Sequence, residues 1–231
     1  LDVNAEDAAC DVQFGVVRRP THPSTPWDAA KFEVCAHRFV DLSEPSFGVA
    51  VLNDGRYGHG LFDGAVRVSL ARAAKYPDPG ADHGRHTVRL ALLPHGPGLR
   101  EVRAAASRLN SPPRLVVDGT VAGAPATLPP LVRLVGRDDA EPGVGVDAVK
   151  PADDGSGDLV VRLHEACGDR TSLTVAAARR VGRAWRCDLL EGEQAALDVA
   201  DGVVALTLRP FELVTLRLRL TDDFDGRDRQ V

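Results

Sequence analysis

Alternation of apolar and polar residues over short runs is the feature that most constrains the fold of this chain. It is clearest near the C-terminus, where aliphatic and polar residues alternate along the sequence. The aliphatic residues are Val214, Leu216, Leu218 and Leu220, and the polar residues between them are Thr215, Arg217 and Arg219. Successive side chains of a β-strand point to opposite faces of its sheet. The run therefore predicts a strand with one face buried and the other exposed to solvent.

Similar runs, separated by Pro, Gly, Asn and Asp, occur along the whole chain. We expect strands at 11–17, 32–42, 47–52, 66–70, 86–93, 114–117, 131–135, 144–149, 159–165, 172–176, 183–189, 203–208 and 213–220. A single stretch has helical spacing, with Leu99, Val102, Ala106 and Leu109 on one face before Pro112. The sequence thus predicts an all-β fold of antiparallel β-sandwich regions with one short helix.

Residues 118–130 have the composition of an inter-domain linker. They are rich in Gly, Ala and Pro, and Pro129 and Pro130 close the segment. We therefore predict a first β region at 1–128 and a second at 129–221. Residues 222–231 have too few apolar side chains to fold, so we expect a disordered tail.

Composition excludes several classes of protein. Lys and Arg number 28 against 33 Asp and Glu, a net charge of -5, so no basic excess favours nucleic acid as a partner. No apolar run reaches the roughly 18 residues of a membrane helix. The four cysteines form no C-x-x-C pair, and we expect Cys35 and Cys167 to be buried free thiols, which favours the reducing cytoplasm.

The chain contains no methionine and begins at Leu1. A complete translation product starts with Met. We therefore expect these residues to be a segment of a longer protein, with part of its active machinery upstream.

Common catalytic motifs are missing from the sequence. It has no G-x-S-x-G, no phosphate-binding G-x-x-x-x-G-K-[ST] and no dinucleotide-binding G-x-G-x-x-G after a strand. The segment Asp82 to His86 holds two histidines beside a carboxylate, but Gly84 breaks their convergence, so we favour a polar turn and predict no metal ligands. The Asp-rich run 153–158 is expected to be a turn between two strands, and Trp185 a core residue.

Residues 53–58 are the best candidate for ligand contact. An apolar strand ends at Leu52 and is followed by polar, cationic and aromatic residues among glycines: Asn53, Asp54, Arg56, Tyr57 and Gly58. A sugar needs such a mixture, because its hydroxyls bind amide, carboxylate and guanidinium groups while its C–H face packs on a ring. Asn-Asp-Gly is equally typical of a plain hairpin turn, so both interpretations stay open.

Several blocks of the chain resemble the C-terminal half of the family 38 glycoside hydrolases, the α-mannosidases. The blocks are FGVVRRPTH at 14–22, WDAAKFEVCAHRFVDL at 27–42, LNDGRYG at 52–58, LARAAKYPDP at 70–79, ADHGRH at 81–86 and ALLPH at 91–95. Two more, VKPADD at 149–154 and VRLHEA at 161–166, are similar to the terminal β domain of the same enzymes. The resemblance spans roughly residues 11 to 220.

The resemblance implies a retaining hydrolysis of α-mannosidic bonds in the parent enzyme. Its nucleophilic aspartate and its zinc ion belong to an α/β barrel that lies N-terminal to everything in this chain. We therefore expect the chain alone to be inactive, to have no catalytic residue, metal or cofactor of its own, and to have the barrel and a mannoside as partners. The chain departs from the commoner form of the 53–58 loop in having Gly55 where a cysteine is frequent.

The resemblance also implies a role for the loop. C-terminal sandwiches of these enzymes pack on the barrel, and their loops can approach the sugar. An accessory role that completes and stabilises the sugar site is our first interpretation. The alternatives are a stand-alone carbohydrate-binding sandwich and an immunoglobulin-like interaction module.

Overall fold

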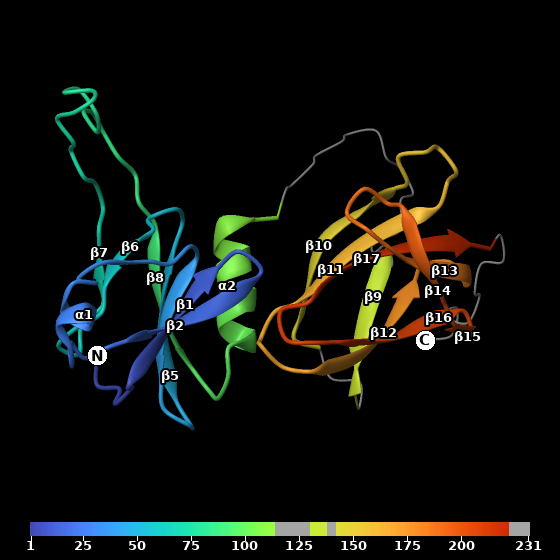
Figure 1. The fold of residues 1–231 in the computed structure, drawn as a ribbon, viewed down its shortest axis with the longest axis horizontal. Helices are drawn as coiled ribbons and strands as arrows, with labels where there is room; N and C mark the ends of the chain where they lie inside the picture. The colour runs from blue at the N-terminus through green and yellow to red at the C-terminus, as the bar shows by residue number, and fades with distance from the viewer. Residues whose placement is uncertain (114–129, 138–141, 222–231) are drawn as a thin grey trace, which may run out of the picture. The chain divides into compact units, whose positions relative to one another are not determined.

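The computed structural model describes residues 1–113, 130–137 and 142–221 (Figure 1). The chain divides into two compact units, Leu1–Val116 and Val117–Val231. Three predicted features fall wholly or almost wholly outside the described residues: the strand at 114–117, the linker at 118–130 and the tail at 222–231. The described elements form four antiparallel sheets and two helices, so the predicted all-β class is confirmed.

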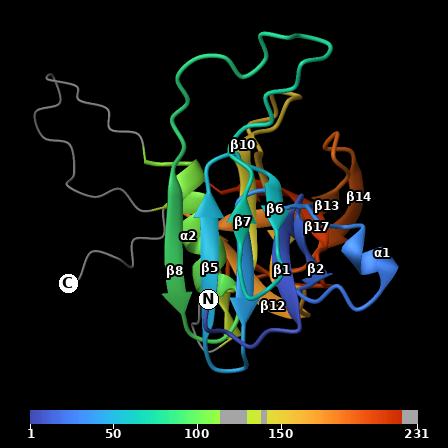
Figure 2. The ribbon, with the colours of Figure 1, turned by 90° about the vertical axis from the view of Figure 1, so that its left-hand side faces the viewer.

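The first unit has three layers. Its central sheet has the order β2-β1-β4-β5-β8, formed by Gly15–Pro20, Asp7–Val12, Phe39–Ser43, Gly48–Asn53 and Leu90–His95. Helix α2 (Arg100–Asn110) packs on one face through Val102 and Ala106, which contact Phe39 and Leu52. A small sheet has the order β3-β6-β7 and is formed by Val34–Cys35, Gly58–Gly60 and Arg67–Val68 (β6 and β7 are labelled in Figure 2). A second apolar cluster of this unit includes Leu61 and has Val34 packed against it.

Buried charges connect the layers of this unit. The carboxylate of Asp11 in β1 accepts hydrogen bonds from Nε and Nη2 of Arg38, at 2.8 and 3.0 Å, and Nη1 of Arg103 in α2 lies 3.8 Å away. A second carboxylate, that of Asp41, lies 2.7 Å from Nε2 of His95 across the sheet. Asp11 and Arg103 thus connect the central sheet with α2, whereas Asp41 and His95 connect two strands of the central sheet.

The second unit is a two-sheet sandwich. One sheet has the order β10-β11-β17-β13-β14, formed by Val144–Pro151, Leu159–Glu165, Leu213–Leu220, Val181–Cys187 and Glu193–Leu197. The other has the order β15-β16-β12-β9, formed by Val199–Ala200, Val203–Leu208, Thr171–Ala177 and Val132–Gly136. Aliphatic side chains of both sheets form a single core cluster, the expected result of period-2 alternation.

Strand β17 confirms the alternation on its apolar face and corrects it on the other. Val214, Leu216 and Leu218 lie in the core, and Leu220 packs against it. On the opposite face Arg219 is exposed as predicted, but Thr215 and Arg217 are only 2% and 9% exposed.

The turn between β10 and β11 supplies partners for that face of β17. The Asp158 carboxylate accepts hydrogen bonds from Arg217 Nε at 2.7 Å and Arg219 Nε at 2.9 Å, and Asp154 accepts one from Arg217 Nη2. Hydrogen bonds from Arg219 and Arg217 outweigh the effect of burial and lower the pKa of Asp158. The turn at 153–158 was predicted, but its contacts with β17 were not.

Several predicted strands have different bounds. The strand at 11–17 is a hairpin of β1 and β2, because Phe14 has a φ of 54° and turns the chain. The strand at 32–42 is split into β3 and β4. The predicted helix is confirmed as α2, and a second, four-residue helix α1 (Pro26–Ala29) begins at the N-cap Thr25.

The Asp158 ion pairs predict a stability difference that depends on pH. Because the folded-state pKa of Asp158 is lowered, its stabilising effect is complete above the ordinary carboxyl range near about pH 4 and is lost as the pH falls through the folded-state value. We expect Asp158→Asn to reduce the free energy of unfolding by about 3 kcal/mol at pH 7. Urea titrations at pH 7 and pH 3 measure this, and a difference that does not shrink at pH 3 would contradict it.

Candidate functional site

The candidate loop at 53–58 is fixed at its first residue by a fully buried side chain. Asn53 Oδ1 accepts hydrogen bonds from the backbone N–H groups of Gly55 and Arg56, at 2.9 and 2.7 Å. Its backbone N–H donates to the carbonyl of Arg38, and its carbonyl accepts from the side chain of Asn110 in α2. Asn53 therefore holds the loop from beneath, as Asn side chains do in tight turns.

Asp54 connects the loop to the segment that leads into β8. Its Oδ2 accepts a hydrogen bond from Arg89 Nε at 2.9 Å, and its Oδ1 accepts one from the backbone N–H of Arg89. These bonds lower the pKa of Asp54, so the carboxylate is ionised near neutral pH. Two of its acceptor positions are already occupied by a residue 35 positions away in the sequence.

Arg56 and Tyr57 are the accessible groups of the loop. Arg56 is half-buried, and the Tyr57 side chain is 53% exposed. The Tyr57 ring lies against His37, with ring centroids 4.8 Å apart and planes tilted by 35°. The loop thus presents a partly exposed arginine followed by an aromatic ring that packs on His37.

Gly55 and Gly58 of the loop are each required as glycine for a different structural reason. Gly55 has a φ of 120°, a conformation that side-chain-bearing residues rarely adopt, and open space surrounds its Cα. Gly58 lies in β6 under the carboxylate of Glu33, with which a Cβ at this position would clash. Gly55 therefore allows the turn, and Gly58 allows the close approach of Glu33. The Glu33 carboxylate also accepts a hydrogen bond from Ser69 Oγ.

Sequence analysis missed His59, which follows the loop. It is fully buried, its Nδ1 lies 3.1 Å from the carbonyl of Tyr57, and burial lowers its pKa. The imidazole is therefore neutral near pH 7 and holds the Tyr57 backbone from inside. The alternation of β6 is too short, with glycines on both sides of His59, for the sequence to reveal it.

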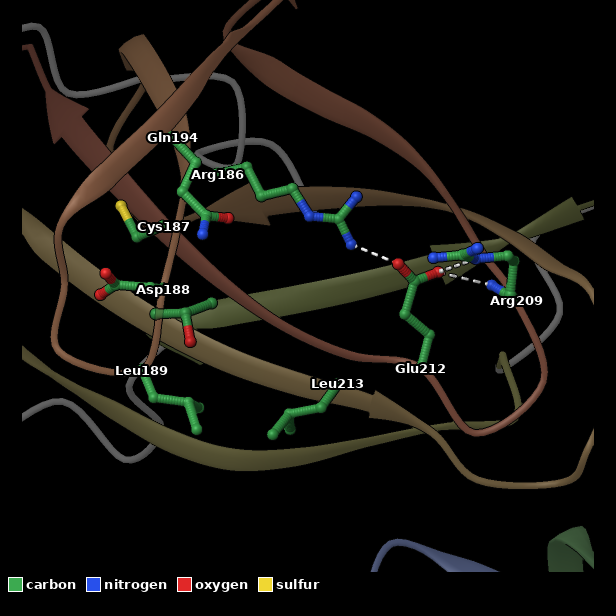
Figure 3. Close-up of a pocket in the computed structure, with 9 residues that line it drawn as sticks. Arg186, Cys187, Asp188, Leu189, Gln194, Arg209, Glu212 and Leu213 are labelled. Atoms are coloured by element: carbon green, nitrogen blue, oxygen red, sulfur yellow. Dashed lines mark hydrogen bonds and ion pairs between the residues drawn. The ribbon is translucent and has the colours of Figure 1, made fainter.

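A hollow of about 460 Å³ lies in the second unit (Figure 3). Glu212 is its central polar group and accepts hydrogen bonds from Arg186 Nη2 at 2.5 Å and from the backbone N–H of Arg209 at 2.8 Å. Burial opposes ionisation here, but these hydrogen bonds lower the pKa of Glu212. Because Arg186 and Arg209 pair with Glu212 and the Asp188 carboxylate accepts backbone N–H groups, we assign no chemistry to this hollow.

The described residues include no group of three or more His, Cys, Asp or Glu side chains arranged to hold a metal ion. None of the four cysteines forms a disulfide. Cys35 is exposed, contrary to prediction, because β3 is a two-residue edge strand, and Cys167 is half-buried. Among the described helices, neither has the length and apolar character needed to cross a membrane.

Comparison with known families identifies both ends of the chain. Residues 1–80 match the glycosyl hydrolases family 38 C-terminal domain, and residues 143–216 match the family's C-terminal beta sandwich domain. The chain therefore belongs to glycosyl hydrolase family 38 and consists of its C-terminal β region.

Individual relatives agree with this assignment. Human alpha-mannosidase 2C1 is 39% identical over 224 residues, which are 94% of this chain and 21% of the relative. An alpha-mannosidase of Saccharomyces cerevisiae is 46% identical over 41% of this chain and 9% of its own length. The chain thus spans about a fifth of the length of the first of these relatives.

Solved structures show the same fold. An alpha-mannosidase from Enterococcus faecalis V583 superposes with a TM-score of 0.68 at 21% identity, covering 93% of this chain and 24% of the solved one. At this identity the likeness concerns the fold alone.

The hydrogen bonds of Asn53 predict a local effect of its replacement. Asn53→Ala removes the acceptor of two loop N–H groups, so we expect the free energy of unfolding to fall by about 1–2 kcal/mol. Amide exchange of Gly55 and Arg56 should accelerate more than that of β5. The control is Asn4→Ala, at an exposed position. Unchanged exchange at Gly55 and Arg56 would contradict this account of the loop.

Proposed function

We propose that this chain is the accessory C-terminal β region of a retaining α-mannosidase that releases terminal α-D-mannosyl residues. In this proposal the 53–58 loop completes the wall of the parent enzyme's sugar site. The observation that carries it is the loop itself, in which the buried Asn53 holds the backbone at the end of β5 while Arg56 and the Tyr57 ring stay accessible. Preorganised polar groups of this kind bind sugar hydroxyls without the cost of ordering a mobile loop.

The proposed roles of the substrate-side residues follow from their contacts. Arg56 donates hydrogen bonds to a sugar hydroxyl, and Tyr57 packs its ring against the sugar's C–H face. Asn53 and Asp54 are positioning residues, because the first holds the loop backbone and the second is bonded to Arg89. Gly58 leaves room for the carboxylate of Glu33, which lies directly against it.

The names of the relatives support the reaction class, since those proteins are called alpha-mannosidases. The catalytic carboxylates, the zinc ion and its Asp and His ligands are assigned to the barrel of the parent polypeptide. The described residues of this chain offer no convergent ligand set for zinc. The cytoplasm remains our proposed compartment, because none of the four cysteines forms a disulfide and disulfides are rare in the reducing cytosol.

A stand-alone carbohydrate-binding sandwich is the second candidate function. The exposed ring of Tyr57 beside Arg56 is the observation that favours it. Titration of this chain with mannose distinguishes the two. Saturable binding in the absence of the parent enzyme would support the second candidate, whereas the accessory role predicts none.

The accessory role predicts a kinetic effect of Arg56→Ala in the full-length parent enzyme. A hydrogen bond from a charged group contributes about 1.5–3 kcal/mol, so kcat/KM should fall about 10- to 150-fold. The melting temperature should stay within about 2 °C, since the side chain is partly exposed. Steady-state kinetics with an aryl α-mannoside measures this, with exposed Arg100→Ala as control. Equal kinetics in the two variants would overturn the proposed contact.

A second prediction concerns the chain by itself. Retaining hydrolysis needs two carboxyl groups about 5–5.5 Å apart across the scissile bond. We assign both to the barrel, so the purified 231-residue chain should release no nitrophenol from a nitrophenyl α-mannoside, with or without added zinc. Zinc-dependent release that survives repurification would contradict the assignment.

A further inference from the structure

A long arm stands out from the first unit between β7 and β8. Residues 69–89 contain no helix or strand, and all but three of them are exposed. Both ribbon views show the arm extending past the ends of β7 and β8, well beyond the sheets (Figures 1 and 2). We call residues 69–89 the arm.

The arm is tied together internally. The Asp82 carboxylate on the returning limb accepts hydrogen bonds from the backbone N–H groups of Arg72 and Ala73 on the outgoing limb, at 3.1 and 2.7 Å. These bonds lower the pKa of Asp82. His86 Nε2 lies 2.9 Å from the Asp82 carbonyl. The two limbs therefore hold each other without help from the sheets.

The arm is also rooted in the candidate loop. The first arm residue, Ser69, donates its backbone N–H to the carbonyl of Gly58 at 2.9 Å. The last, Arg89, holds the carboxylate of Asp54. Both ends of the arm therefore attach to the 53–58 loop. Displacement of the arm would break these hydrogen bonds or move the loop with it.

The outer part of the arm carries an aromatic side chain with few contacts. Tyr76 is 88% exposed and follows Lys75. Across the arm the cations are Arg72, Lys75, Arg85 and Arg89, and the anions are Asp78 and Asp82. An exposed tyrosine beside a lysine is suited to anchor an interface, because its ring supplies a large contact area at little cost in conformational entropy.

The polypeptide around this chain supplies the occupant of such an interface. The chain covers 21% of human alpha-mannosidase 2C1, and its matched regions are C-terminal domains, so most of that relative precedes the matched segment. Leu1 lies in the same unit as the arm, and its amino group donates to the carbonyl of Gly64, between β6 and β7.

We propose that the arm is the docking element through which this region binds the preceding catalytic part of the parent polypeptide, with Tyr76 as its anchor. The partner surface is an apolar recess for the ring, bordered by carboxylates that face Lys75 and Arg72. Docking of the arm sets the position of the 53–58 loop, because both ends of the arm are bonded to it. This inference rests on the proposed function and adds the surface that would position the 53–58 loop in the parent enzyme.

Limited trypsinolysis of the full-length parent protein tests the proposal. Cleavage between Arg72 and Ala73 needs a free arm, so we expect it to be at least about tenfold slower in the parent protein than in the 231-residue chain alone. Tyr76→Ala in the parent should restore fast cleavage there. The control is Leu190→Ala, which removes an exposed apolar side chain from the second unit and should leave cleavage slow.

Cleavage of the parent protein as fast as that of the chain alone would overturn the docking proposal. So would a Tyr76→Ala parent that stays as protected as the Leu190→Ala control. The failure of the sugar contact is distinguishable from either outcome, because it is read from the kinetics of Arg56→Ala and leaves arm protection intact.

Discussion

The buried carboxylate of Asp11 is the interaction on which the candidate site depends. Its bonds to Arg38 fix the segment before β4, and Arg103 approaches it from α2. The carbonyl of the same Arg38 accepts the backbone N–H of Asn53, the first residue of the loop. The position of the loop is therefore set by this charge pair, in which loss of Arg38 would leave the buried carboxylate of Asp11 without the hydrogen bonds of that guanidinium.

In this arrangement the residues that hold the loop backbone differ from the residues that are available to a ligand. The residues that define the loop conformation, Asn53 and His59, are fully buried, whereas the residues offered to a ligand, Arg56 and Tyr57, are accessible. Asp54 belongs to the support because its carboxylate is bonded to Arg89. A site assembled from several regions of a large enzyme benefits from such rigidity, since a wall that is ordered in advance does not have to be ordered on binding.

Local pattern was enough to predict the fold class and the core of the second unit. The alternation in β17 placed Val214, Leu216 and Leu218 correctly, because burial of an apolar face is a property of the strand itself. The burial of Arg217 was not predictable in the same way. It depends on Asp158, which is 59 residues away in the sequence and meets Arg217 only in the folded chain.

The candidate loop shows the same limit. Its residue types suggested a ligand-facing turn, but the sequence could not say that Asn53 points inward or that Asp54 is bonded to Arg89. The hairpin of β1 and β2 was missed because its turn contains Phe14 in a left-handed conformation that glycine usually supplies. The arm carried no periodic signal, and its ties to Asp54 and Gly58 are visible only in three dimensions.

The central claim is that the 53–58 loop forms part of the parent enzyme's sugar site. A crystal structure of the full-length parent with a mannose-derived inhibitor tests it most directly. The account predicts that the Arg56 guanidinium lies within about 3.2 Å of a sugar oxygen, with the Tyr57 ring against the sugar. An inhibitor bound in the barrel with Arg56 and Tyr57 facing bulk solvent would contradict it.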